Sequence, residues 1–491
     1  MSKQQIKFIS LFAGLAIALF FYFVNPFGVN EKASIVLSIA ALMISWWVTE
    51  ALPMPVVALL PLVLFPLFGV AELKTVAVSY GDQNIFLFMG GFMLGLAIEK
   101  WNLHRRIALG IVKITGTSGN RIVLGFILST GFISMWISNT ATTMMMFPIA
   151  LSVVHVMKDS SDSAGNFKNF SLAMMLSIAY ASNFGGISTI IGTPPNAAFV
   201  SIYEKQYSNI GFIDWMLLCM PMAIILLITL YIVLTKVLFR NHIRPSGAAR
   251  LYINEEYKSL GPLSVSEKRV LVIFLSTAFL WILKDPVNNL QDVIKLDDTI
   301  IALMGGIALF VCPSGSLKQK EDKNGSDENN LQGSLLEWDD TKKMAWGILL
   351  LFGGGIALAT ALDKAGLIQQ LGVWLSHFAT GGFVLLLMVT VLSIFISEVM
   401  SNIAQVIVFT PVVCSLADAV GMPPLQLGIA MTLASSCASM MPMGTPPNAI
   451  AFASGHIKLK EMLKAGFVMN IVSVVLITLF CWFLLPLLMK L

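Results

Sequence analysis

The sequence predicts an all-α polytopic membrane protein with about eleven transmembrane helices, two re-entrant hairpins and inverted-topology repeats. Three observations support this fold class. Of the 491 residues, 57% are hydrophobic and 12% are charged, whereas soluble domains carry about 25% charged residues. Apolar stretches long enough to cross a bilayer recur along the chain, and three motifs of its first half recur in its second. This composition disfavours a soluble enzyme, a nucleic-acid-binding protein and a disordered scaffold.

The individual spans follow from runs of roughly 20 mainly apolar residues, the length that a helix needs to cross the hydrocarbon core. The first run follows Lys3 and Lys7, and no small-residue cleavage site comes after it. We therefore interpret it as a transmembrane helix and not as a signal peptide. The predicted spans are 8–24, 33–49, 54–70, 85–99, 172–191, 212–239, 270–284, 299–313, 346–362, 424–443 and 464–489.

Two further apolar stretches, 122–157 and 383–417, are too long for one span. Each is interrupted at its middle by polar residues, Ser138-Asn139-Thr140 in the first and Ser401-Asn402 in the second. A polar break halfway along an apolar stretch indicates a hairpin that enters the membrane and turns back. We expect the polar residues to form the two hairpin tips at membrane depth.

The chain also repeats itself. Gly-Thr-Pro-Pro-Asn-Ala occurs at 192–197 and again at 444–449. The tip sequence at 138–141 recurs with one change, Ser-Asn-Ile-Ala, at 401–404, and a further serine precedes both tips by four residues. A glycine-rich helix upstream of each tip is similar as well. Because the motifs keep their order, we expect two structural repeats.

The charge distribution indicates that the two repeats have opposite orientations in the membrane. Residues 100–121, after the first glycine-rich helix, hold five Lys and Arg residues, whereas 365–382, after the second, hold none. By the positive-inside rule the second copy is inverted, and the N-terminus is cytoplasmic. Inverted repeats with interrupted helices near the midplane are typical of secondary transporters. The predicted organisation is an N-terminal helix (1–32), a first repeat (33–239) with its hairpin at 122–157 and a broken helix around 192–196, a cytoplasmic linker (240–269), and a second repeat (270–489) with its hairpin at 383–417 and a broken helix around 444–448.

The repeated Gly-Thr-Pro-Pro-Asn motif predicts a broken helix within the membrane. Two consecutive prolines remove two amide donors and push the preceding residue out of the α region. The break frees carbonyl groups, which are tolerated at depth only where they line a cavity or bind a ligand. The helix that follows presents a partly positive N-terminus. A single copy could be a simple kink, but duplication beside a second polar motif favours a binding site.

The hairpin tips offer hydroxyl and amide groups and no formal charge. Hard oxygen ligands from Ser, Asn and freed carbonyls suit a small cation such as sodium, while amide and hydroxyl donors suit a carboxylate. Hydrogen bonding between helices is the alternative for such a cluster. No Lys or Arg lies within either motif, and a buried cation would be costly at the bilayer centre.

Other classes of membrane protein fit less well. A membrane-embedded hydrolase needs paired aspartates or a His-Glu-x-x-His helix, and the sequence has neither. A cation/proton antiporter needs a titrating carboxylate at mid-membrane, for which only Glu398 is a candidate. The five cysteines have no paired spacing, so neither a disulfide framework nor a zinc site is expected. We expect no cofactor beyond a coupling ion, and no nucleic-acid partner.

At these residues the sequence resembles the divalent anion:sodium symporter family, which carries dicarboxylates, citrate and sulfate. The resemblance includes Trp46-Trp47-Val48-Thr49-Glu50-Ala51-Leu52-Pro53, both hairpin tips, Ser397-Glu398 and both Gly-Thr-Pro-Pro-Asn breaks. It implies a homodimer in the cytoplasmic membrane, with a fixed scaffold and a mobile transport domain that carries its substrate by an elevator movement. It also implies two sodium sites, one in each repeat, and a carboxylate substrate held between the tips.

The resemblance implies roles for individual residues. The first sodium site would use Ser134, Ser138, Asn139 and the backbone of Gly192. The second would use Ser397, Asn402 and the backbone of Met400 and Gly444. The substrate carboxylates would be bound by Asn139, Thr140 and Thr193 from one side, and by Asn402, Thr445 and Pro446 from the other. Glu398 would shape the second hairpin or take part in coupling.

One residue departs from the family pattern. The second tip usually reads Ser-Asn-Thr, but this chain has Ile403 in place of the threonine. Loss of a donor against a buried charged acceptor costs about 1–3 kcal/mol, so the substrate is expected to differ from a simple C4-dicarboxylate at that end. The alternatives that the sequence leaves open are an unusual dicarboxylate, a longer tricarboxylate, an inorganic oxyanion such as sulfate, and sodium-independent anion exchange.

Overall fold

The computed structural model of the chain describes residues 3–158, 164–243, 245, 247–291, 293–315, 333–370 and 381–490. Over these residues the fold is built from helices and contains no β-strand, which confirms the predicted all-α class. The helices are α1 (Lys3–Val24), α2 (Glu31–Val48), α3 (Met54–Val57), α4 (Leu60–Leu67), α5 (Leu73–Val78), α6 (Gln83–Lys100), α7 (Leu103–Thr115), α8 (Gly119–Ser134), α9 (Asn139–Met157), α10 (Ala164–Gly186), α11 (Pro194–Tyr203), α12 (Phe212–Ile232), α13 (Gly247–Ser259), α14 (Val265–Leu290), α15 (Asp298–Val311), α16 (Trp346–Lys364), α18 (Gly382–Ser397), α19 (Asn402–Ala419), α20 (Pro424–Ser435), α21 (Pro446–Ala453), α22 (Leu459–Leu479) and α23 (Leu485–Leu488).

Within the described ranges, nine helices are long and apolar enough to cross a membrane. Seven of them fall on predicted spans, and the other two, α9 and α19, are the second arms of the predicted hairpins. Three further predicted spans, 54–70, 299–313 and 424–443, contain shorter apolar helices. The stretch 54–70 is divided into α3 and α4 because prolines stand at the start of both short helices and lack the amide donor that a continuous helix needs.

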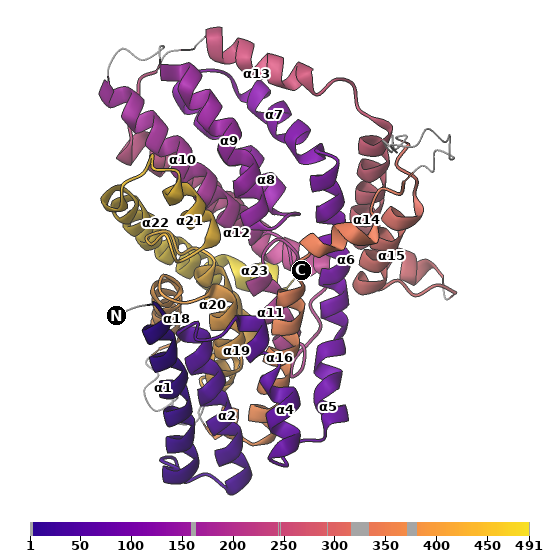
Figure 1. Cartoon of the computed structure of the whole chain (residues 1–491), viewed down its shortest axis with the longest axis vertical. Helices are drawn as coiled ribbons and strands as arrows, with labels where there is room; N and C mark the ends of the chain where they lie inside the picture. The colour runs from indigo at the N-terminus through magenta and orange to yellow at the C-terminus, as the bar shows by residue number, and fades with distance from the viewer. Residues whose placement is uncertain are drawn as a thin grey trace.

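Each predicted hairpin folds as two helices joined by four residues. In the first hairpin α8 and α9 flank residues 135–138, and in the second α18 and α19 flank 398–401. Figure 1 shows the two hairpins toward opposite ends of the long axis, α8 and α9 in the upper half and α18 and α19 in the lower half. In each hairpin the two helices extend from their joining residues toward an end of the molecule, and the breaks lie near its middle (Figure 1).

The half-helices that follow the two breaks exchange partners between the repeats. Helix α11, which follows the first break, packs against α19 of the second hairpin. Helix α21, which follows the second break, packs against α9 of the first hairpin and against α10. The hairpin of each repeat therefore packs against a half-helix of the other repeat, so the region between the hairpins is formed by both repeats.

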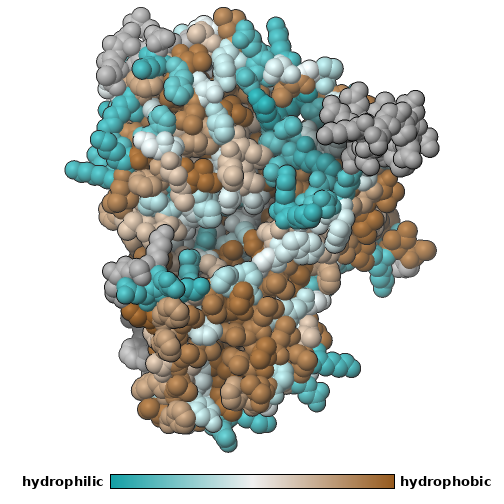
Figure 2. All heavy atoms as spheres, in the orientation of Figure 1, coloured by the Kyte–Doolittle hydropathy of each residue, from teal (hydrophilic) through white to brown (hydrophobic). Residues whose placement is uncertain are grey.

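The distribution of hydropathy over the surface agrees with a membrane protein. Figure 2 shows brown, hydrophobic spheres over much of the lower half, where α1, α2 and α4 lie, and teal, hydrophilic spheres at the upper end, near α13. Large apolar side chains on α1 are exposed, among them Phe12 (68%) and Phe23 (76%). Such side chains are stable in contact with lipid, not with water, so this face is a membrane surface.

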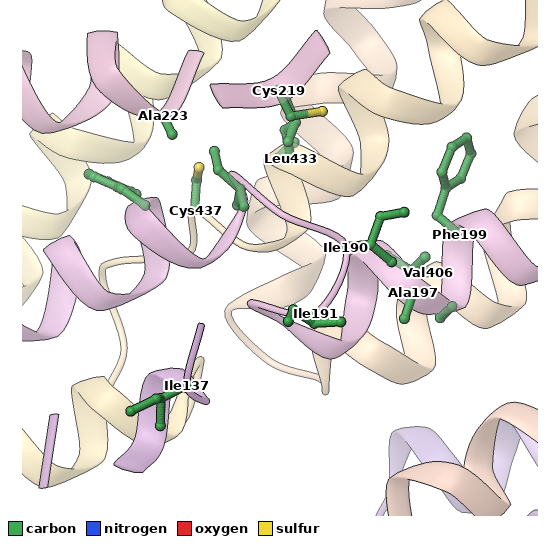
Figure 3. Packing of buried hydrophobic residues seen from close by; sticks show 14 of the residues in the cluster. Ile137, Ile190, Ile191, Ala197, Phe199, Cys219, Ala223, Val406, Leu433 and Cys437 are labelled. Atoms are coloured by element: carbon green, nitrogen blue, oxygen red, sulfur yellow. The ribbon is translucent and has the colours of Figure 1, made fainter. Parts of the chain in front are cut away.

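The interior behind the first break is apolar and closely packed. Figure 3 shows Ile190, Ile191 and Phe199 of the break and α11 beside Val406 of α19, and all four are buried. A Cβ added to Gly428 of α20 would collide with the Phe199 ring, so glycine is needed there for α11 to approach. This contact fixes the position of α11 against the second repeat.

Close approach of two glycines joins the first hairpin to α10. A Cβ at Gly185 of α10 would lie closer than 3.0 Å to backbone atoms of Gly131 on α8. Backbone atoms cannot move aside as a flexible side chain can, so a side chain at Gly185 would separate the helices. The hairpin and the end of α10 thereby behave as one packed unit.

We expect Gly185→Ala to destabilise the protein by about 1–3 kcal/mol through overpacking, which lowers the midpoint of thermal unfolding in detergent. Gly165→Ala is the matched control, because Gly165 lies in the same helix and an added Cβ there meets nothing within 4 Å. Equal unfolding midpoints for the two variants would contradict the close approach of α8 and α10.

Candidate functional site

The first hairpin tip brings three of the predicted sodium ligands together. Ser134, fully buried at the end of α8, donates its hydroxyl hydrogen bond to Asn139 Oδ1 at 2.7 Å. Ser138 is the N-cap of α9 and accepts a hydrogen bond from the Ala141 amide at 3.3 Å. The tip is held because the cap residue satisfies an amide that the helix leaves free. The Ser134 and Asn139 oxygens lie within one hydrogen bond of each other.

Glycines make room for this tip. A Cβ at Gly186, the last residue of α10, would collide with Asn139 Oδ1, and a Cβ at Gly192 would collide with the Gly186 carbonyl. The predicted ligands Asn139 and Gly192 therefore lie on either side of Gly186. A side chain at Gly186 would occupy the position of the Asn139 oxygen.

The first break is closed by the asparagine of the repeated motif. Asn196 Nδ2 donates to the carbonyls of Gly186, Ile187 and Thr189 at 3.2, 3.3 and 2.7 Å. The Thr189 hydroxyl donates to the Met135 carbonyl of the hairpin tip at 2.6 Å and accepts from the Gly192 amide at 3.0 Å. Protein donors thus bind the carbonyls of Gly186, Ile187 and Thr189 beside the break, where the sequence predicted that freed carbonyls line a cavity or bind a ligand.

The second break is closed in the same way. Asn448 Nδ2 donates to the carbonyls of Ala438 and Met441 at 3.1 and 3.2 Å. Thr445 is the N-cap of α21, and its hydroxyl oxygen accepts from the Asn448 amide at 3.4 Å. The repeated asparagine therefore has the same structural role in both copies.

Glu398 attaches the second tip to the second break. Its side chain is 4% exposed. Oε1 accepts from the amides of Ser439 and Met440, both at 2.8 Å, and Oε2 accepts from the Met441 amide at 2.8 Å. Asn470 of α22 donates a fourth hydrogen bond, to Oε1 at 2.6 Å. Four donors satisfy the buried carboxylate, so Glu398 holds backbone in place.

The two repeats differ at this point. The residue equivalent to Glu398 in the first tip is Met135, whose carbonyl accepts from Thr189. One repeat therefore joins its tip to its break through a hydroxyl and the other through a carboxylate. The carboxylate holds three successive amides where the hydroxyl holds one carbonyl, so the second tip is fixed more strongly to its break.

The second tip places its predicted residues less tightly. The Ser397 hydroxyl donates to the Ser435 carbonyl at 2.6 Å. Asn402 and Ile403 are half-buried, and within the described residues the Asn402 side chain has no hydrogen-bond partner. Gln405 turns inward and donates to Ser393, to its hydroxyl at 2.6 Å and its carbonyl at 3.0 Å. Gln405 therefore braces the hairpin, and Asn402 is left available at the tip.

The remaining predicted residues lie at the breaks and tips but differ in exposure. Thr140 is half-buried in the first turn of α9, and Met400 is half-buried in the second tip. Pro446 is exposed at the first position of α21. Gly444 is buried, and a Cβ there would approach Glu398 Oε2 at 2.9 Å. These positions surround the tips without a hydrogen bond that joins them to one another in the described structure.

Side-chain hydrogen bonds link the two repeats through Asn139, Asn183 and Thr445, a series that we call the polar path. Asn139 Nδ2 donates to Asn183 Oδ1 at 3.3 Å and to the Thr193 hydroxyl at 3.4 Å. Asn183 Nδ2 donates to the Thr445 hydroxyl at 3.0 Å. The structure thereby brings together Asn139, Thr193 and Thr445, predicted from sequence. Asn183 was missed, and the only signal for it was a polar residue in the apolar stretch 172–191.

A cavity of about 90 Å³ adjoins the first tip and the first break. Ser138, Gly192 and Glu99 of α6 are among the residues that line it. Its rim includes Lys343, the last residue of a 3₁₀ turn at Trp338–Lys343. In that turn partial burial acts to raise the pKa of Asp340, but hydrogen bonds from the Glu337 amide and Lys100 outweigh it and hold the pKa below its ordinary value.

We expect Glu398→Gln to lower the unfolding midpoint by several degrees, because an NH₂ group would replace an acceptor oxygen opposite backbone amides, at a cost of about 1–3 kcal/mol. Glu72→Gln is the control, since Glu72 is exposed and makes no side-chain cap. Thermal unfolding of both variants in detergent measures the difference. Equal midpoints would show that the four hydrogen bonds do not hold the second tip.

Comparisons with known proteins agree with this geometry. The chain is 36% identical over 468 residues to the sodium-dependent dicarboxylate transporter SdcS of Staphylococcus saprophyticus, which covers 94% of this chain and 88% of that protein. It is 35% identical over 470 residues to SdcS of Staphylococcus aureus strain MSSA476, with the same coverage. Among solved structures, the YdaH transporter of Alcanivorax borkumensis aligns with a TM-score of 0.50 at 12% identity, over 83% of this chain and 86% of that one, a likeness of fold.

The family described as the sodium:sulfate symporter transmembrane region matches residues 5–490. The resemblance inferred from the tips and breaks is thereby confirmed. Members of this family are membrane transporters and not enzymes, and the apolar helices of this chain make it a multi-pass membrane protein. The chain belongs to the sodium:sulfate symporter family.

Proposed function

We propose that this chain is a secondary active transporter that moves dicarboxylate anions across the cytoplasmic membrane together with sodium. The observation that carries the proposal is the polar path from Asn139 through Asn183 to Thr445. It joins the first hairpin tip, whose oxygens suit a cation, to the second break, whose hydroxyl suits an anion. The SdcS relatives, named as sodium-dependent dicarboxylate transporters, support the same ligands.

Sodium would bind to oxygen atoms of the two tips. In the first repeat these are Ser134 Oγ, Ser138, Asn139 Oδ1 and the Gly192 backbone. In the second they are Ser397, Asn402 and the backbone of Met400 and Gly444. Neutral oxygens at these distances suit a small hard cation, and the free Asn402 side chain can turn toward it. The bound cations would supply the positive charge that the motifs themselves lack.

The carboxylate would bind to hydroxyl donors at the breaks. Thr445 Oγ1 accepts from Asn183 Nδ2 and from the Asn448 amide. A hydroxyl has two acceptor sites and one proton, so these two bonds leave the Thr445 proton to be donated to an anion. Thr193 accepts from Asn139 and keeps its proton as well. Thr140, Asn402 and Pro446 would complete the site around the substrate.

The elevator movement and the homodimer belong to the same proposal. The exchange of partners between α11 and α19, and between α21 and α9, supports a transport domain that moves as one body. The scaffold would comprise α1, α2, α6 and α14 to α16. The N-terminus would be cytoplasmic, as the positive-inside rule suggests.

Sulfate is the second candidate substrate, because the matching family is described by sodium:sulfate symport and Ile403 offers no hydroxyl to a second carboxylate. Exchange of anions without sodium is the other outcome that the transport measurement below can give. All three activities would use the donors at Thr193 and Thr445. The two symport activities differ in the anion that binds, whereas anion exchange differs from both because sodium does not occupy the tips.

We expect uptake of labelled succinate into proteoliposomes to rise steeply with an inward sodium gradient. Replacement of sodium by choline at constant ionic strength is the control. Equal uptake in choline, with stimulation by unlabelled anion on the other side, would establish an exchanger. Sodium-dependent uptake of labelled sulfate, with no uptake of labelled succinate above that of empty liposomes, would replace the dicarboxylate with an inorganic oxyanion.

We expect Asn139→Ala and Asn402→Ala each to reduce uptake by roughly tenfold or more. Removal of a partner of a charged ligand costs about 1.5–3 kcal/mol, and each 1.4 kcal/mol corresponds to a factor of ten in affinity. Asn209→Ala, at an exposed loop position, is the control. Normal uptake by either tip variant, with a normal elution profile in detergent, would remove that residue from the site.

Ile403→Thr tests the departure from the family pattern. A threonine hydroxyl at the second tip would add one donor, so we expect tighter binding of a C4-dicarboxylate relative to sulfate and citrate. The measurement is the competition profile of labelled succinate uptake in both proteins. Identical profiles would show that position 403 does not set substrate preference.

A further inference from the structure

Asn183 lies on α10 at the point where the two repeats meet. Its side chain is 1% exposed, and both ends of its amide are engaged by residues of the proposed site. Oδ1 accepts from Asn139 of the first hairpin tip, and Nδ2 donates to Thr445 of the second break. Thr445 is 262 residues away in the sequence. The proposed function uses Asn183 as the middle of this path and assigns its side chain no contact with either ligand.

The hydrogen bonds of this path all run in one direction. Ser134 donates to Asn139, Asn139 donates to Asn183, and Asn183 donates to Thr445. Both acceptor sites of the Thr445 oxygen are then occupied, because the Asn448 amide donates to it as well. The proton of Thr445 is therefore directed away from the protein network, toward the place where an anion would bind. Asn183 determines that Thr445 acts as a donor.

A cation at the start of this path would strengthen every bond along it. Sodium on Asn139 Oδ1 would withdraw electron density from the amide and make its N–H groups better donors. The effect passes through the Asn183 amide, since hydrogen bonds in series polarise one another in a low-dielectric interior. Thr445 then becomes a better donor to a carboxylate.

We infer that Asn183 is a positioning residue that couples the sodium site of the first repeat to the carboxylate site of the second. The inference rests on the proposed function, since it needs both ligands, and it identifies which contact links them. Coupling between two sites requires a physical element that both ligands bias. The Asn139–Asn183–Thr445 path is such an element, because one end contacts the proposed cation site and the other contacts the proposed anion site.

Coupling is measured as a ratio of affinities. We would determine the Kd of succinate for the purified full-length protein in detergent, once in sodium and once in choline at equal ionic strength. In the wild type we expect sodium to lower this Kd by a factor in the range of roughly 5–150, the usual size of coupling between sites. In Asn183→Ala we expect the ratio to fall toward 1, because the path is interrupted.

The control is Ser177→Ala on the same helix. Ser177 is fully buried, and its hydroxyl bonds only to the Met174 carbonyl of its own helix. This variant removes a buried polar group from α10 without touching the path, so it should keep the wild-type ratio. General destabilisation of α10 lowers the unfolding midpoint and can occur in either variant, whereas a loss of coupling changes the Kd ratio only in Asn183→Ala.

Asn183→Ser serves as the second variant if Asn183→Ala does not yield folded protein. A serine is too short to reach both Asn139 and Thr445, so we expect its ratio to fall below the wild-type ratio as well. By thermodynamic reciprocity, succinate should also change sodium affinity less in these variants than in the wild type.

The possible outcomes distinguish the role of Asn183 in coupling from the proposed sodium symport. A wild-type ratio in Asn183→Ala, or in Asn183→Ser when that is the folded variant, would overturn the role of Asn183 and leave sodium-coupled transport intact. A ratio of 1 in the wild type itself would overturn both the coupling and the proposed symport. A normal wild-type ratio that falls only in the Asn183 variants supports the inference.

Discussion

The structure of the site depends on how the two broken helices are held together inside the membrane. Each break exposes backbone carbonyls and amides that water cannot reach, and each unsatisfied group would cost several kcal/mol there. The protein meets this constraint with short neutral side chains, Asn196 in the first repeat and Asn448 in the second, whose amides donate to the freed carbonyls. Because these donors are uncharged, the breaks stay open to ligands of either sign.

This solution also explains the low charge of the site. A permanent cation would bind the substrate without sodium, and coupling would then be lost. In the proposed site, neutral oxygens would bind sodium next to hydroxyls that would bind a carboxylate, so that binding of each ligand would depend on the other. Glu398, the buried carboxylate at the second tip, is satisfied by three backbone amides and Asn470. Its carboxylate oxygens therefore accept hydrogen bonds from the backbone and are not available to a ligand.

Much of this arrangement could be predicted from the sequence, because its signals are local. The consecutive prolines at 194–195 and 446–447 prevent a helix from continuing through them and stand at the start of a new one, and a polar tip in an apolar stretch indicates a hairpin. The structure brings the tip and break residues Asn139, Thr193 and Thr445 together in one hydrogen-bonded path, and their binding of ligands stays a prediction. What sequence could not show is which partner a buried polar group finds. Asn183 and Asn470 each appear as one polar residue in an apolar stretch, and their partners lie 262 and 72 residues away.

The central claim is that sodium and an anion bind together at depth between neutral groups of the two repeats. The most direct test is a cryo-electron microscopy structure of the protein with sodium and succinate. We expect anion density in contact with the Thr193 and Thr445 hydroxyls, with cation density at Ser134 and Asn139. Anion density held by a lysine or arginine, away from both breaks, would contradict it.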